Sequence, residues 1–196
     1  MSRLRGLPPD TLDPEQRALY DEIVASRRGG GTFDLFATGG ALAGPFNAMV
    51  YAPALGRHWS AIGARLRFDS VLDQRLVELV ICTVGAYYQA DFEFQAHAPL
   101  ALRAGVGEGV LDALRQGDTP SFDRDDERIV HDLAGRLLRA EHIGSDVYTA
   151  AEAVLGEGGM VELASLVGYY AALAIGLNLF AVGPPTGNEP IWGSAR

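Results

Sequence analysis

The residues best suited to chemistry lie in one stretch of the sequence, from Glu78 to His97. Glu78 interrupts an apolar segment, and a carboxylate drawn toward a core needs a partner because burying it alone is unfavourable. Glu93 and His97 are four residues apart, so on a helix their side chains share one face. If the chain folds back around residues 85–89, the three groups meet in one pocket. Such a set suits general acid and base work, because a carboxylate fixes the imidazole tautomer and burial raises the pKa of a carboxyl group.

The same three residues allow two further interpretations. A Glu and a His that face each other across a helical hairpin can satisfy each other for structural reasons alone, because structural ion pairs also shift pKa values. Two carboxylates and one imidazole could also hold iron or manganese, although no second His follows at helical spacing. We expect no metal and no cofactor.

Four neighbouring residues are further candidates. Arg75, three residues before Glu78, could pair with that carboxylate or bind a substrate carboxylate. Tyr87 and Tyr88 could donate hydrogen bonds to a substrate oxyanion, or they could be packing aromatics. Cys82 is a possible redox residue, but apolar surroundings and a nearby carboxylate would raise the pKa of its thiol, so we expect a structural cysteine.

Helical periodicity dominates the elements that must position these groups, and strand signals are nearly absent, which predicts an all-α, compact multi-helix bundle. Expected helices cover about 46–66 with a break near Pro53, then 73–87, 90–104, 107–114, a segment from 123, 145–155 and 163–182. The helices over 73–87 and 90–104 form the central hairpin. About seven helices result.

The first helix carries the clearest capping signal. Asp13 is the expected N-cap, with Gln16 reaching back to it as in a capping box. Leu19, Ile23 and Val24 then mark its buried face.

We expect one domain over residues 1–196. Its parts are an N-terminal helix and Gly-rich loop (1–44), a core (72–114), a second helical half (115–182) and a C-terminal tail (183–196). The glycines of the loop do not form a phosphate-binding motif, because no Gly-Lys-Ser/Thr follows them. Residues 163–182 carry no charge and are long enough to cross a bilayer, but they lack flanking Lys or Arg. A buried core or oligomer-interface helix is the better interpretation.

Composition excludes several classes of function. The chain has 196 residues, of which 16 are Lys or Arg and 25 are Asp or Glu, so its formal net charge is −9. That balance argues against nucleic acid as a partner, because phosphate backbones need clustered basic residues. One cysteine permits neither an internal disulfide nor a Cys-x-x-Cys pair, which favours a cytoplasmic protein. With no signal sequence, we expect a small-molecule substrate and no membrane partner.

A weak internal similarity is also visible. Glu78 and Glu162 both lie between Val and Leu, and each precedes a tyrosine pair, either Tyr87 with Tyr88 or Tyr169 with Tyr170. A duplicated helical hairpin would place two similar helices in the core, although chance explains so short a match equally well.

The spacing of Glu78, Ala90, Glu93 and His97 resembles the framework of the carboxymuconolactone decarboxylase and alkyl hydroperoxidase D-like superfamily. The resemblance covers about 72–114, and the residues after His97 look like those of decarboxylase-like members. Peroxidase members have cysteines where this chain has Ala90 and Glu93, so a dithiol peroxidase cycle cannot run here. The resemblance implies an all-α bundle that forms homo-oligomers, commonly trimers or hexamers.

The resemblance also implies a function. We expect a cofactor-independent enzyme that decarboxylates or isomerises a small carboxylate or lactone by proton transfer. His97 would be the acid, Glu78 would orient or shuttle the proton, Glu93 would fix the imidazole, and Arg75 or a tyrosine would anchor the substrate. A second hypothesis is a hydroperoxide-reducing, peroxiredoxin-like activity that uses Cys82. A third is a non-catalytic oligomeric ligand-binding protein.

Overall fold

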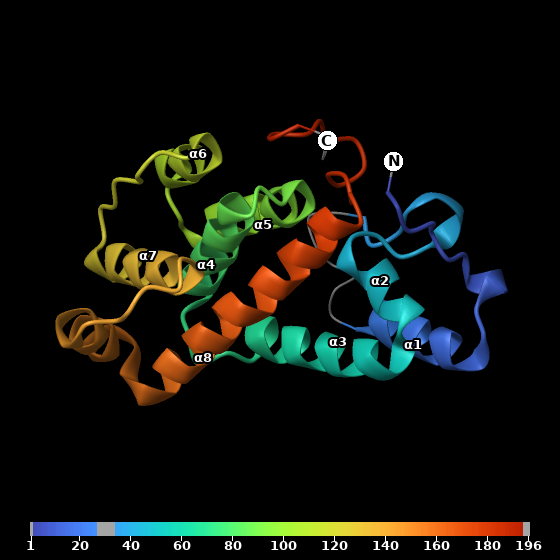
Figure 1. The fold of residues 1–196 in the computed structure, drawn as a ribbon, viewed down its shortest axis with the longest axis horizontal. Helices are drawn as coiled ribbons and strands as arrows, with labels where there is room; N and C mark the ends of the chain where they lie inside the picture. The colour runs from blue at the N-terminus through green and yellow to red at the C-terminus, as the bar shows by residue number, and fades with distance from the viewer. Residues whose placement is uncertain (1, 27–33, 194–196) are drawn as a thin grey trace.

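The computed structural model describes residues 2–26 and 34–193, and their regular elements are helical. The α-helices are α1 (Pro14–Ala25), α2 (Pro45–Tyr51), α3 (Pro53–Phe68), α4 (Gln74–Tyr87), α5 (Asp91–Ala104), α6 (Glu108–Gln116), α7 (Asp125–Leu138) and α8 (Ser145–Leu179). Two short 3-10 helices, Pro9–Thr11 and Thr38–Gly40, and one isolated bridge complete the described part. The predicted all-α fold is therefore confirmed (Figure 1).

The start of α1 follows the predicted cap. The Asp13 side chain accepts hydrogen bonds from the first turn, and the Gln16 side chain accepts one from the Asp13 backbone, so a capping box is formed. Leu19 and Ile23 are fully buried, as predicted. Val24 is 36% exposed, and its prediction was wrong because one residue turns the helix about 100° away from the stripe that positions 19 and 23 share. Residues 27–33 of the predicted Gly-rich loop lie outside the described residues.

Helices α4 and α5 form the predicted central hairpin. Gly85 allows the close approach, because a Cβ there would press against the backbone of Phe94 at about 3.1 Å. The chain reverses at Gln89, whose φ of 50° is in the left-handed region. Gly105, with φ of 102°, ends α5 as a left-handed cap. The hairpin brings the face of α4 that carries Glu78 against the inner face of α5.

The remaining boundaries differ by a few residues from those predicted. Pro53 begins α3, so the predicted break there separates two helices. Residues 145–155 and 163–179, expected as parts of separate helices, belong to α8, which continues through Gly156 in a non-helical conformation (φ 67°, ψ 169°) and ends three residues before the predicted end at 182. A kink at this glycine lets the two parts of α8 take different directions.

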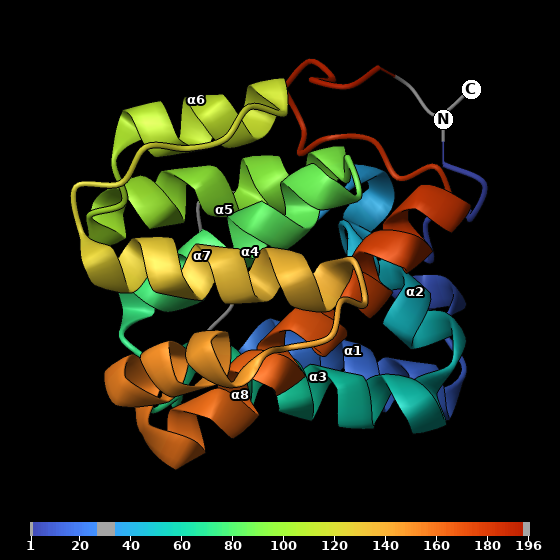
Figure 2. The ribbon, with the colours of Figure 1, turned by 60° about the vertical axis from the view of Figure 1, so that its left-hand side comes forward.

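Helix α8 crosses the whole molecule. Figure 1 shows it running diagonally, with α4–α7 on one side and α1–α3 on the other, and Figure 2 shows it beneath α7 and beside α3. Its buried residues include Leu163, Leu166 and Ala174, which belong to the largest apolar cluster together with residues of α4 and α7. By length and composition alone α8 is long and apolar enough to cross a membrane. That is weak evidence, because core helices of soluble proteins pass the same test.

The last described residues lie along α5. The backbone N–H of Ile191 donates to Asp91 Oδ1 at 2.6 Å, and the indole N–H of Trp192 donates to the carbonyl of Arg115 at 3.0 Å. The Trp192 ring also packs edge-on against Phe94. These contacts fix the N-terminal turn of α5, from which Glu93 projects.

Candidate active site

A hydrogen bond joins the two helices of the hairpin at the candidate site. Nδ1 of His97 lies 2.7 Å from Oε2 of Glu78, and both side chains are buried. The amide of Gln74, one turn earlier on α4, donates to the other Glu78 oxygen at 3.0 Å. The Gln74 side chain thus holds Glu78, and Glu78 in turn fixes the ring orientation of His97. We did not predict Gln74, although its spacing of four from Glu78 was a usable signal.

Glu93 is the unusual member of the set. It is only 3% exposed, and neither of its carboxyl oxygens has a hydrogen-bond partner in the part of the chain that the structure describes. Burial raises its pKa well above the ordinary value of 4.5, which favours the neutral form of the carboxyl group. The expected role of Glu93 in fixing the imidazole is therefore not what the geometry gives, because Glu78 makes that hydrogen bond.

Glu93 and His97 line an internal cavity of about 40 Å³ between α2, α3, α5 and α8. Its walls are Pro45, Phe46, Gly63, Arg67, Phe92, Glu93, Ala96, His97, Tyr169, Tyr170, Leu173 and Leu177. A space of this size holds a few water molecules or a small polar group. Most of the lining is apolar, which leaves Glu93, His97, Arg67 and the tyrosines as its polar groups.

Arg67 brings a positive charge to the cavity from α3. Its Nε is buried without a hydrogen-bond partner, and its guanidinium carbon lies 4.8 Å from the centre of the Phe68 ring. Gly63, one turn earlier, makes room, because a Cβ at that position would collide with the hydroxyl of Tyr169. Sequence reasoning missed Arg67, since nothing in its local spacing connects it with residues on α5.

The tyrosine pair of α8 forms the wall opposite α5. The Tyr170 ring contacts the His97 ring edge-on, with centroids 5.4 Å apart. Burial raises the pKa of Tyr170 well above 10.0, so its phenol stays protonated and can act as a donor. Tyr169 donates its hydroxyl hydrogen to the carbonyl of Trp59 at 3.0 Å, so that group is already engaged. The weak similarity between the two tyrosine pairs was the only sequence signal for Tyr170.

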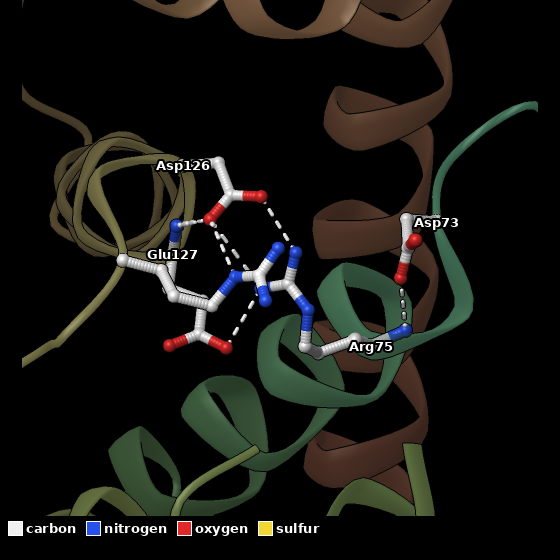
Figure 3. A network of polar contacts seen from close by, with 5 residues as sticks. Asp73, Arg75, Asp126 and Glu127 are labelled. Atoms are coloured by element: carbon white, nitrogen blue, oxygen red, sulfur yellow. Dashed lines mark hydrogen bonds and ion pairs between the residues drawn. The ribbon is translucent and has the colours of Figure 1, made fainter. Parts of the chain in front are cut away.

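The structure places Arg75 away from this cavity. Its Nη1 lies 2.7 Å from Glu127 and its Nη2 lies 2.6 Å from Asp126, both on α7 (Figure 3). Burial alone would lower the pKa of Arg75, but the hydrogen bonds to the two carboxylates raise it on balance. Arg75 therefore joins α4 to α7, and it does not line the cavity that was expected to need it as a substrate anchor.

Tyr87 and Tyr88 also lie elsewhere. Tyr87 is 47% exposed, and the two rings pack edge-on against each other with centroids 5.1 Å apart. The carbonyl of Tyr88 accepts a hydrogen bond from Asn178 at 2.7 Å, which ties the end of α4 to α8. Neither residue lines the cavity, so the prediction that they contact substrate is replaced by a packing role.

Cys82 is fully buried in the apolar cluster formed by α4, α5 and α6, where it lies with Leu79 and Phe94. Burial, followed by the nearby charges of Glu78 and Glu93, raises its pKa well above 9.0. Because the thiolate is the reactive form, this environment makes Cys82 a poor nucleophile.

The geometry also bears on the metal interpretation and on the internal similarity. Within residues 2–26 and 34–193, no group of three or more His, Cys, Asp and Glu side chains is arranged to hold a metal ion, so the metal interpretation gains no support. Glu162, the counterpart of Glu78 in the internal similarity, accepts hydrogen bonds from the Ser70 hydroxyl and the Val71 backbone. It does not join the site.

The fold is that of alkylhydroperoxidase D-like proteins. The chain is similar over 100% of its length to an uncharacterized peroxidase-related protein with an alkylhydroperoxidase AhpD core from Ralstonia eutropha JMP134 (TM-score 0.74, 15% identity, 96% of that chain). A peroxidase-related protein from Silicibacter sp. TM1040 gives a TM-score of 0.70 at 15% identity, covering 100% of this chain and 96% of that one. The debrominase Bmp8, in complex with 2,3,4-tribromopyrrole, gives 0.71 at 13% identity and 95% coverage of both chains.

The family comparison agrees with the fold. The model of the carboxymuconolactone decarboxylase family matches residues 53–123, a segment that includes Arg67, Glu78, Glu93 and His97. The search of curated proteins found no match. Residues 53–123 therefore match the carboxymuconolactone decarboxylase family, and the chain as a whole has the AhpD-like fold.

Proposed function

We propose that this protein is a cofactor-independent enzyme that transfers a proton during decarboxylation or isomerisation of a small carboxylate or lactone. The proposal is supported by three groups of complementary chemistry around one cavity: the His97 ring with its Glu78 partner, the neutral acid Glu93 and the cation Arg67. A family that includes decarboxylases agrees with this chemistry.

Substrate binding is the first role of these groups. The Arg67 guanidinium attracts an anionic substrate into the cavity, where its Nε lacks a partner. The neutral carboxyl of Glu93 and the phenol of Tyr170 can each donate a hydrogen bond to a substrate carbonyl oxygen. Such donors stabilise the negative charge that develops on that oxygen when it becomes an enolate.

Proton transfer follows from the orientation of His97. In decarboxylation, the bond between the α-carbon and the carboxylate breaks, carbon dioxide leaves, and the bonding electrons form an enolate. The Nε2–H of a protonated His97 then delivers its proton to carbon, and the ring regains a proton from water. Glu78 holds Nδ1–H throughout and stabilises the charged ring. For isomerisation, a neutral His97 removes a proton from one carbon and returns it to another.

The single observation that carries the proposal is the unpartnered state of Glu93. A structural pair explains Glu78 with His97, but it does not explain a buried carboxyl group whose two oxygens meet no donor among residues 2–26 and 34–193. Buried polar groups in folded proteins nearly always have partners, so an exception in a cavity indicates a place for a ligand.

Replacing His97 tests the proposal. We expect His97→Ala to keep the helical circular dichroism spectrum while turnover of a panel of unsaturated carboxylates and lactones falls by at least about 100-fold. Unchanged turnover would contradict the proposal. If His97→Ala unfolds, the same assay on Glu93→Gln decides, because that variant keeps the volume and lacks the acid.

We also propose that the chain forms homo-oligomers, as the resemblance implies. Val161, Ile175 and Leu179 are exposed apolar residues on α8, and burying them against another copy would be favourable. Light scattering after size exclusion tests this, since Ile175→Lys should shift an oligomer toward the monomer. A wild-type chain that is monomeric at micromolar concentration would contradict it.

A further inference from the structure

A second hollow lies next to the candidate active site and has a different character. It has a volume of about 230 Å³ and lies between α2 and α3 on one side and α8 on the other. Its walls are Gly44, Pro45, Ala48, Met49, Ala52, Leu55, Gly56, Trp59, Ala172, Leu173, Gly176, Leu177, Phe180 and Val182. We call it the apolar groove, because none of these residues carries a charge.

The apolar groove and the polar cavity share part of their lining. Pro45, Leu173 and Leu177 belong to both. Leu173 and Leu177 are one turn apart on the same face of α8, so their side chains form the partition between the two hollows. Both walls of this partition are side chains with rotatable bonds, so a rotamer change at Leu173 or Leu177 would join the two hollows.

The sizes of the two hollows decide how a ligand can be distributed. The polar cavity, at about 40 Å³, accepts a carboxylate or a group of that size but not a whole organic acid. Sites for small molecules usually measure roughly 300–1,000 Å³. The polar cavity alone is far below that range, and the apolar groove supplies most of the volume that a ligand of ordinary size needs.

We infer that the ligand of this site is an amphipathic acid whose carboxylate enters the cavity beside Arg67 and Glu93 and whose apolar hydrocarbon group lies in the apolar groove. This inference rests on the proposed function for the site of reaction and adds the class of substrate. Arg67 supplies the opposite charge for the head group. Glu93 is 3% exposed, lines the cavity and has no partner there, which independently marks the end where a polar group binds.

The apolar groove selects the remainder of the ligand by exclusion. A hydroxyl or charged substituent placed there would lose its hydration among side chains that are nearly all apolar, with the indole N–H of Trp59 as the main polar group, which is unfavourable. A hydrocarbon group loses only unfavourable contact with water. Each buried methylene should therefore improve binding by about fourfold.

Linear carboxylates from butanoate to decanoate provide the test, with isothermal titration calorimetry on the full chain. We expect the dissociation constant to fall by about fourfold with each methylene until the groove is filled, and then to level off. The corresponding alcohols should bind more weakly than the acids of equal length, because they lack the charge that Arg67 attracts. Equal affinity for all chain lengths would overturn the inference.

Two glycines of α8 give a matched pair of variants. A Cβ at Gly176 or at Gly168 would meet nothing within 4 Å, so a side chain can start at both positions without a clash, but only Gly176 lines the apolar groove. Gly176→Leu should abolish the gain from butanoate to octanoate, whereas Gly168→Leu should leave it intact. An equal effect of both variants would show that the groove is not the binding site.

A different occupant of the apolar groove gives a recognisable outcome. If a second copy of the protein fills the groove, Gly176→Leu changes the oligomeric state in light scattering. The affinity of the wild type for carboxylates then does not depend on the length of the carboxylate, and the inference fails. A failure of the proposed function looks different: the dependence of affinity on chain length persists, yet no carboxylate in the series or in the unsaturated panel is turned over.

Discussion

Two regions of the described chain hold buried ionisable side chains and treat them in opposite ways. At the contact between α4 and α7, Arg75 meets both Asp126 and Glu127, and all three find partners (Figure 3). In the cavity, both oxygens of Glu93 and the Nε of Arg67 have none. The first arrangement is explained by folding. The unpartnered groups in the cavity destabilise the folded protein, and they are the kind of groups that a ligand-binding site requires.

The largest expected effect on stability comes from removing the ion pairs between α4 and α7. Arg75→Met would leave Glu127, whose side chain is 4% exposed, as an unpaired buried charge. We expect the free energy of unfolding to fall by about 3–5 kcal/mol, measured by urea denaturation at pH 7.

The matched change in the cavity is Arg67→Met. Because its Nε has no partner to lose, we expect a change in stability within about 1 kcal/mol, together with weaker binding of carboxylates of every length. A loss of stability as large as that of Arg75→Met would erase the distinction between the two regions.

The charge state of Glu93 predicts a dependence of stability on pH. Its pKa is raised by burial, so the folded protein holds this proton more tightly than the unfolded chain, whose ordinary value is 4.5. The resulting stability is complete below that value and is lost as the pH rises toward the folded-state pKa. Glu93→Gln cannot ionise. Above about pH 4.5, the free energy of unfolding of this variant should therefore rise relative to that of the wild type, by at most about 1.4 kcal/mol per pH unit, as measured by thermal unfolding. A difference that grows toward acid pH instead would contradict the assignment.

The smallest expected effect concerns Cys82. Cys82→Ala removes one buried sulfur from the cluster of α4, α5 and α6, which should lower stability by about 1 kcal/mol. Turnover of the carboxylate should not change, because Cys82 packs in the apolar cluster and does not line the cavity. A peroxidase assay sharpens the point: hydroperoxide reduction by the wild type that disappears in Cys82→Ala would restore the redox hypothesis.

Sequence spacing predicted the parts of the site that are local. The interval of four residues between Glu93 and His97 puts them on one face of α5, and Gly85 signals where α4 and α5 meet. Which carboxylate holds the imidazole could not be read from spacing, because it depends on the distance between two helices. Glu93 lacks a partner because the imidazole of His97 forms its hydrogen bond with Glu78 instead.

Contacts between segments that are distant in the sequence account for the parts of the site that spacing did not predict. Arg75 was a reasonable substrate anchor until α7, about fifty residues later, supplied two carboxylates. Arg67 and Tyr170 reach the cavity from α3 and α8, and no local pattern relates them to His97. The sequence defined the helices and the hairpin well, because capping and apolar periodicity are local properties, whereas the lining of a cavity is set by tertiary packing.

The proposed chemistry depends most on Glu93 being a neutral carboxylic acid with a free hydrogen-bonding group in the cavity. Infrared difference spectroscopy between the wild type and Glu93→Gln at pH 7 measures this directly. We predict a protonated carboxyl carbonyl band that is present in the wild type, absent in the variant and shifted when a short carboxylate binds. A carboxylate band at pH 7 in place of the protonated one would contradict it.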